Sequence, residues 1–207
     1  MKTLLLTFLV YLVLNCVPSL GHAYFANGES AELVPMDQYR LVLEPQMGHF
    51  NLTAHFDTGV SDSSQVRVSL GSGEDGTHLD FFYKDIPYPD YGQQPAMGYK
   101  VGTVFNSEQG ENTFTLRLMP LVSKTYEINM NRWTPYFSLP LSVSVQKSTS
   151  TTPIHAVLGT ELGLPSAPDM QLGFEVGVSL RDSFSYASAF ISFYFEPPEN
   201  VARLTRH

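Results

Sequence analysis

The sequence has few cysteines, few charges and few long apolar runs. Its one cysteine among 207 residues excludes a framework of disulfides. Charged residues make up 15% of the chain, whereas about a quarter is usual in a soluble domain. After the N-terminal region no stretch approaches about eighteen consecutive apolar residues, so we expect no membrane-spanning helix. The net charge of −8 argues against nucleic acid as a partner, because phosphate binding needs a basic surface.

The N-terminus has the features of a secretory signal peptide, which we assign to residues 1–23. One lysine supplies a positive charge, residues 4–14 are apolar, and small residues stand at positions 21 and 23, where a signal peptidase cleaves. Cys16 raises the alternative of a lipid-anchored N-terminus, but Asn15 stands where a small residue is expected. The sequence therefore predicts export, after which no cysteine remains.

Apolar and polar residues alternate one for one in about ten stretches between residues 39 and 195. In residues 171–181 every even position is apolar and every odd one is glycine, polar or charged. Such alternation over about ten residues is the length that crosses a bilayer as a tilted strand. We therefore expect an all-β chain that forms a closed antiparallel up-and-down transmembrane β-barrel of about ten strands, within a range of about eight to twelve. The expected division is a signal peptide at 1–23, an N-terminal extension at 24–38, the barrel at 39–195 and a C-terminal tail at 196–207.

Two prolines bear on the number of strands. Residues 126–130 keep the parity of Phe114 beyond Pro120, so we expect one long strand, kinked near the proline, instead of two. That choice gives an even number, as closed bacterial single-chain barrels have. Pro140 interrupts the alternating stretch 134–146, and we expect a bulge there because proline lacks the N–H that a strand of the wall needs.

In such a barrel one face of each strand meets lipid and the other lines the lumen. The apolar, lipid-facing candidates are Leu52, Phe56, Val66, Val68, Phe114, Leu116, Val143, Phe174, Val176 and Val178. The lumen-facing candidates, whose opposite charges can pair, are His55, Asp57, Arg67, Asp80, Lys84, Lys100, Arg117, Glu161, Glu175 and Arg181. Barrels of about eight strands are filled by their own side chains, and wide water channels need about sixteen. A general diffusion pore is therefore disfavoured.

The last alternating stretch resembles the assembly signal of bacterial outer-membrane β-barrel proteins. Ser188, Phe193 and Phe195 match its polar residue and its closing aromatic–x–aromatic. Phe190 departs from it, since glycine is usual there, and the chain continues beyond the last aromatic residue. The resemblance covers residues 39–195 and is to the architecture of small porin-like and OmpA-like barrels. It implies a Gram-negative bacterium, outer-membrane lipid as the surroundings and the barrel-assembly machinery as a partner.

The expected function is that of a structural barrel or a narrow pore for small solutes. We expect no enzymatic activity, cofactor or metal, since metal-binding histidine spacings are missing; the oligomeric state stays open. A secreted soluble β-sandwich that binds a ligand is the alternative, because its strands also alternate. A barrel-rim hydrolase is a lesser one, with His55 and Asp57 or His78 and Asp80 as base and carboxylate, although such pairs also arise by chance. The proline- and tyrosine-rich loop 86–95 could bind a partner, plug the lumen or join an aromatic belt.

Electrophoresis separates the barrel from the sandwich. The mature chain should need detergent for solubility and should migrate differently before and after heating in SDS, because a closed barrel resists the detergent until it is heated. A polypeptide that is freely soluble and monomeric without any amphiphile would exclude the membrane barrel.

Overall fold

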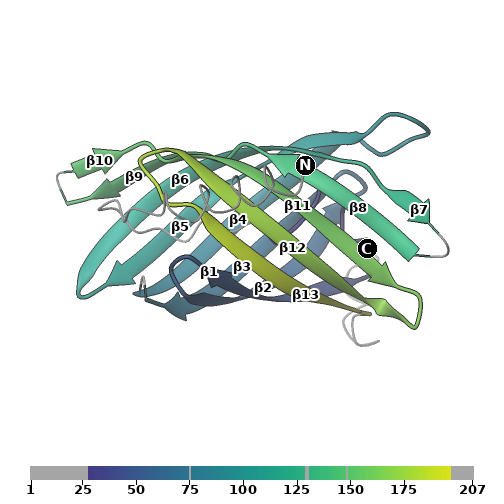
Figure 1. Ribbon diagram of the computed structural model, residues 1–207, viewed down its shortest axis with the longest axis horizontal. Helices are drawn as coiled ribbons and strands as arrows, with labels where there is room; N and C mark the ends of the chain where they lie inside the picture. The colour runs from purple at the N-terminus through teal and green to yellow at the C-terminus, as the bar shows by residue number, and fades with distance from the viewer. Residues whose placement is uncertain (1–27, 75, 129–130, 148, 197–207) are drawn as a thin grey trace, which may run out of the picture.

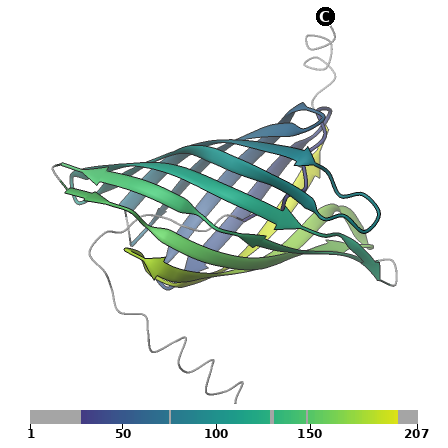
Figure 2. The same ribbon diagram turned by 90° about the horizontal axis from the view of Figure 1, so that it is seen from above.

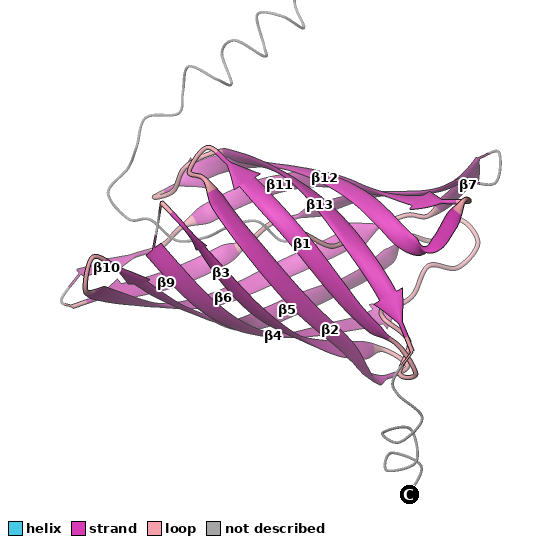
Figure 3. Cartoon of the chain, turned by 90° about the horizontal axis from the view of Figure 1, so that it is seen from below, coloured by secondary structure: helices cyan, strands magenta, loops and turns pink. Residues whose placement is uncertain are grey.

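The computed structural model describes residues 28–74, 76–128, 131–147 and 149–196, and the wall in this part of the chain is built from strands alone (Figures 1 and 3). The proposed signal peptide and most of the C-terminal tail lie outside the described residues. The strand segments are β1 Tyr39–Met47, β2 Asn51–Ser61, β3 Ser64–Gly73, β4 Gly76–Tyr88, β5 Ala96–Glu108, β6 Glu111–Ser123, β7 Tyr126–Ile128, β8 Asn131–Ser138, β9 Leu141–Gln146, β10 Thr149–Thr151, β11 Ile154–Leu164, β12 Ala167–Arg181 and β13 Tyr186–Phe195.

These segments form a barrel of 10 strands. β8 and β9 continue one another along the wall, because both pair with β6 on one side and β11 on the other. β7 extends β6 and β10 precedes β11, and their hairpins with β8 and β9 project at opposite ends of the barrel (Figure 1). β13 pairs with β1 and closes the ring, in which all strands are antiparallel and strongly tilted (Figure 2). The expected closed antiparallel barrel is confirmed.

The prolines mark the interruptions of the wall. Pro140 lies between β8 and β9, where the Leu139 N–H donates to the Pro120 carbonyl (3.2 Å) and the His155 N–H donates to the Pro140 carbonyl (3.1 Å). The residues on either side of the proline keep one register, with Ser138 opposite Val157 and Leu141 opposite Ile154. The expected bulge is therefore wrong, and the interruption is a two-residue gap between strand segments. β6 runs through Pro120, and the Lys124 N–H bonds a carbonyl of β8 (3.2 Å) before β7 begins. β6 and β7 pair with β8 in the same register, so the single long strand is confirmed. Its interruption lies at residues 124–125, and the kink near Pro120 stays a prediction.

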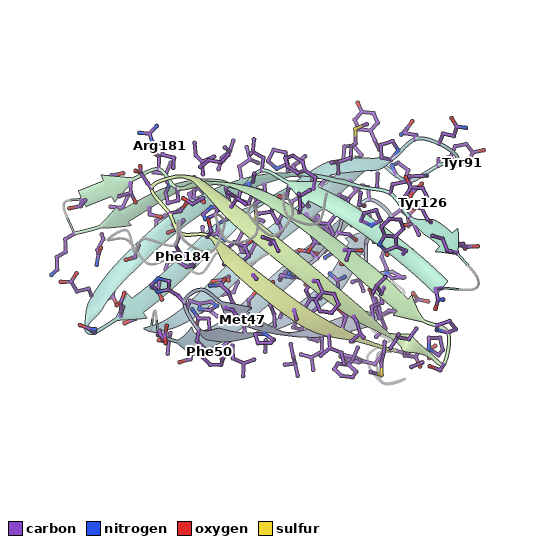
Figure 4. All side chains as sticks on the ribbon, in the orientation of Figure 1. Met47, Phe50, Tyr91, Tyr126, Arg181 and Phe184 are labelled. Atoms are coloured by element: carbon purple, nitrogen blue, oxygen red, sulfur yellow. The ribbon has the colours of Figure 1, made fainter. Side chains whose placement is uncertain are left out.

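The wall is polar on its inner face and apolar on its outer face. On β12 the side chains of Phe174 and Val176 are 53% and 42% exposed, whereas Glu175 between them is 1% exposed. Polar and charged residues outnumber apolar ones among the buried residues, and apolar side chains cover the outside (Figure 4). A soluble domain would expose a very large apolar surface in this way. The pattern is that of a transmembrane barrel whose outer face meets hydrocarbon.

The single closed sheet also excludes the alternative fold, a soluble β-sandwich. A sandwich buries apolar rows between two sheets, but here the apolar rows face outward and the buried centre is polar. Within the described residues, no helix is long and apolar enough to cross a bilayer.

On the inner face, glycines lie directly opposite aromatic rings of the neighbouring strand. Such pairs are Gly71 with His78, Gly102 with Phe82, Gly159 with Tyr136, Gly173 with Phe190 and Gly177 with Tyr186. A Cβ added at any of these glycines would overlap the facing ring. The glycines therefore make room for large side chains in a narrow lumen, and the rings fill much of its cross-section.

Replacing one of these glycines should destabilise the barrel. Gly173→Val should lower the free energy of unfolding in detergent by about 1–3 kcal/mol, because the added methyl groups overpack against Phe190. Adding Phe190→Leu should restore part of the loss. Ala187→Val enlarges an exposed residue of the neighbouring strand and should leave stability unchanged; equal losses in Gly173→Val and Ala187→Val would contradict the packing role.

Candidate functional site

Residues 28–34 lie inside the barrel and form no part of its wall; we call them the inserted segment. Glu29 and Ser30 are fully buried, and Ala31 and Val34 are 1% exposed. The chain then turns through residues 35–38, where the Gln38 N–H donates to the Pro35 carbonyl (3.1 Å), and enters β1. Residues 28–34 of the expected N-terminal extension therefore fold back into the lumen.

Glu29 is the centre of the charged contacts in the lumen. Its carboxylate faces four cations, which we call the cation cluster: Lys100 on β5 (Nζ 2.6 Å), Lys84 on β4 (Nζ 2.8 Å), Arg40 on β1 (Nη2 2.9 Å) and Arg67 on β3 (Nη1 3.4 Å). The Gln65 amide also donates to Glu29 (2.9 Å). All these side chains are buried, and buried charges are tolerated only when they are paired.

Asp57 on β2 supplies a second carboxylate to the same cations. It accepts from Arg40 Nε (2.7 Å) and from Arg67 Nε and Nη2 (2.6 and 2.8 Å). Two carboxylates thus face four cations, which leaves an excess of two positive charges among these groups. Glu29, which belongs to the inserted segment, supplies half of the direct negative charge.

The rest of the inserted segment reaches the other walls. The Ser30 N–H and hydroxyl donate to Glu161 on β11 (2.8 and 2.9 Å), and the Ala31 N–H donates to Ser123 on β6 (3.2 Å). The Arg132 guanidinium on β8 contacts the Glu32 carboxylate (2.6 Å). The segment is therefore bonded to both sides of the lumen.

The predicted lumen residues, apart from one, are buried inside the wall: His55, Asp57, Arg67, Asp80, Lys84, Lys100, Arg117, Glu161 and Glu175. The prediction for Arg181 is wrong, because its side chain is 62% exposed and points outward beside Asp182 (Figure 4). The pairing of β12 with β11 shifts register here, because His155 pairs with Ser179 but Ile154 pairs with Arg181. This shift breaks the alternation at the end of β12 and turns the Arg181 side chain away from the lumen.

The predicted lipid-facing residues lie on the outer face. Val66 is half-buried, and the others are exposed: Leu52, Phe56, Val68, Phe114, Leu116, Val143, Phe174, Val176 and Val178. In the proposed assembly signal, Ser188 points inward and donates to Glu44 (2.6 Å). Phe193 is half-buried and Phe195 is exposed at the end of β13, where its ring lies 5.7 Å from that of Tyr39. Its role in assembly stays a prediction.

The loop expected at 86–95 is shorter and does not plug the lumen. β4 extends to Tyr88, so the connection comprises residues 89–95. Tyr91 is 83% exposed and projects from one end of the barrel (Figure 4). Lys124 pairs with Asp90 and donates to the Gly92 carbonyl (2.7 Å), which ties the loop to the outgoing end of β6. Two of the roles expected for this loop, binding of a partner and membership of an interfacial aromatic belt, stay predictions.

Of the two pairs expected for a hydrolase, His78 and Asp80 approach each other to 4.0 Å, the limit of an ion pair. His55 instead contacts Ser69 (2.8 Å) and Glu44 (2.9 Å), an order of hydroxyl, imidazole and carboxylate that a nucleophilic enzyme uses. All three are buried in the filled lumen, so a substrate has no access to the hydroxyl in this conformation. No cluster of three or more His, Cys, Asp or Glu side chains suited to a metal occurs in the described residues.

Sequence reasoning missed two features of the lumen. One is Glu29, although the inward rows of β1 to β5 hold more cations than carboxylates and so predict a further anion. The other is a pair of tyrosines, Tyr136 and Tyr186, whose hydroxyls both donate to Glu175 at 2.6 Å. Their inward positions follow from parity alone, and each faces a glycine of the next strand.

Comparison with known proteins shows remote likeness only. No protein-family model matches the sequence, and no curated protein matches it. Similar solved structures include a bacterial polysaccharide outer membrane secretin (TM-score 0.48, 13% identity), of which the alignment covers 58% of that chain and 75% of this one. Others are the KdgM porin in complex with disordered oligogalacturonate (TM-score 0.41) and the KdgM porin (TM-score 0.39), each 8% identical over 77% of this chain and 99% of that chain. The assignment of the barrel therefore depends on the strand pairing itself.

Removing Asp57 should weaken the barrel strongly. Asp57→Asn should lower the free energy of unfolding in detergent by about 3–5 kcal/mol, because Arg40 and Arg67 lose a buried counter-charge. Glu111→Gln, which breaks an exposed pair with Lys147, should have no measurable effect. Similar unfolding midpoints for Asp57→Asn and the parent would show that the cluster does not stabilise the wall.

Proposed function

We propose that the protein is a narrow solute channel of the bacterial outer membrane, closed by its own inserted segment. The observation that supports this most is the position of Glu29. Its carboxylate is buried among the cations of the lumen, but the residue belongs to the inserted segment and not to any strand of the wall. A filling that is separate from the wall can leave without breaking any strand pairing. The signal-like N-terminus and the apolar outer face favour an outer-membrane location.

The contacts of the inserted segment suit a closed state that opens reversibly. The segment is bound by ion pairs and hydrogen bonds, to Glu161, Ser123 and Gln65 besides the cation cluster. It also has one apolar contact, in which Ala31 and Leu33 pack against Ile86, Ala96 and Leu121. Its polar groups can exchange their partners for water once the lumen hydrates. Stripping one partner from a buried ion pair costs about 3–5 kcal/mol, so the closed state predominates.

A purely structural barrel is the second candidate. It is favoured by the inner core of Val42, Tyr136, Val157, Phe184, Tyr186 and Phe190, which fills part of the lumen independently of the inserted segment. In that case, departure of the segment would expose buried charges without creating a path for ions.

Cross-linking the segment to the wall tests the channel. The Ala31 N–H contacts the Ser123 hydroxyl, and the one natural cysteine lies in the predicted signal peptide. The Ala31→Cys/Ser123→Cys chain should show no step currents in a planar bilayer when oxidised and discrete steps after reduction. Each single variant should conduct in both conditions.

A chain without residues 24–34 provides the second measurement. It should conduct at least ten times more often than the full mature chain, because the lumen has lost its filling. Silence of both the truncated and the reduced chains would refute the channel and favour the structural barrel.

A further inference from the structure

We infer that the cation cluster is a binding site for carboxylate solutes, and that Glu29 occupies it as a tethered substitute. The inference rests on the proposed channel, since a solute reaches the cluster only when the inserted segment leaves. It adds to that channel a class of solute and a reason for the segment to open.

The geometry of the cluster fits a carboxylate. Cations from β1, β3, β4 and β5 converge on the two oxygens of one carboxyl group, at distances of 2.6 to 3.4 Å. Asp57 fixes the guanidinium groups of Arg40 and Arg67 by direct hydrogen bonds. The site is thus preorganised, and charge-assisted contacts of this kind are the strong ones.

The charge of the cluster favours an anion over a neutral solute. With Glu29 withdrawn, Lys84 and Lys100 lose the carboxylate that they contact, and Asp57 keeps its contacts with Arg40 and Arg67. A solute carboxylate at the same place restores the lost contacts, whereas a neutral solute does not. The cluster should therefore distinguish solutes by charge.

Lys84 couples solute binding to the release of the segment. Its ammonium group donates to Glu29 Oε2 (2.8 Å) and to the carbonyls of Ser30 (3.1 Å) and Glu32 (2.6 Å). All three acceptors belong to the inserted segment, so its departure removes them together. A solute carboxylate that replaces them lowers the cost of opening, and its affinity for the open state alone shifts the equilibrium.

Glu161 on β11 and Glu175 on β12 accept hydrogen bonds from hydroxyl groups, those of Ser30, Tyr136 and Tyr186. Both carboxylates are buried. Their negative charge disfavours a solute carboxylate beside them and favours one at the cation cluster.

Citrate binding to the refolded mature chain tests the inference. Glu29→Gln should bind citrate at least ten times more tightly than the parent in calorimetry at constant ionic strength, because the tethered competitor is gone. Adding Lys84→Gln to it should weaken binding at least tenfold. Adding Lys147→Gln instead, which removes an exposed cation, should change nothing; equal affinities for the parent and Glu29→Gln would overturn the site.

The cross-linked chain gives the same answer without altering any charge. Oxidised Ala31→Cys/Ser123→Cys keeps Glu29 in the cluster and should not bind citrate, and reduction should restore binding. Equal affinity in both states would also overturn the site.

Current recordings separate failure of this site from failure of the channel. In a potassium chloride gradient, the chain without residues 24–34 should show anion selectivity by its reversal potential, and Lys84→Gln should reduce it. Step currents without anion selectivity would refute the site and retain the channel. Citrate binding without any current would refute the channel and retain the site.

Discussion

The structure depends on compensation of positive charge at the centre of a membrane barrel. Arg40, Arg67, Lys84 and Lys100 point inward from neighbouring strands because parity leaves them no other side. The outer face meets hydrocarbon, where a cation is costly, so the lumen must hold all four. Asp57 neutralises one of these charges, and Glu29, which is not part of the wall, neutralises a second. Without Glu29, Lys84 and Lys100 would lose the carboxylate that they contact.

The small diameter of the barrel brings these charges together, and it also determines how the uncharged part of the lumen is packed. A barrel of 10 strands is wider than one filled completely by its own side chains, but far below the size of a wide water channel. Aromatic rings such as those of Phe190 and Tyr186 fill part of the lumen, and they fit only because glycines face them. The inserted segment fills another part. The rings belong to strands of the wall, whereas the segment does not, so only the segment can leave without disturbing the strand pairing.

Much of the fold could be predicted from the sequence, because alternation with a period of two fixes which side each residue takes. Low charge and apolar outer rows then favoured lipid over water, and the parity across Pro120 gave the strand count. The inserted segment could not be predicted this way, since it has no period and its place is set by contacts distant in sequence, such as Ser30 with Glu161. Arg181 failed for a related reason: a local shift in register breaks the parity rule.

Consecutive residues of the inserted segment explain why it is bonded to both sides of the lumen. The two halves of the wall differ in charge. The cations of the cluster lie on β1, β3, β4 and β5, together with the buried carboxylates Glu44, Asp57 and Asp80 on β1, β2 and β4, whereas β11 and β12 carry Glu161 and Glu175. Glu29 offers a carboxylate to the first half, and Ser30 offers an N–H and a hydroxyl to Glu161 on the second. A filling of uniform polarity would satisfy one wall and leave the other with unpaired buried groups. The lumen is therefore matched to a segment that offers an acceptor on one side and donors on the other, as the consecutive residues Glu29 and Ser30 do.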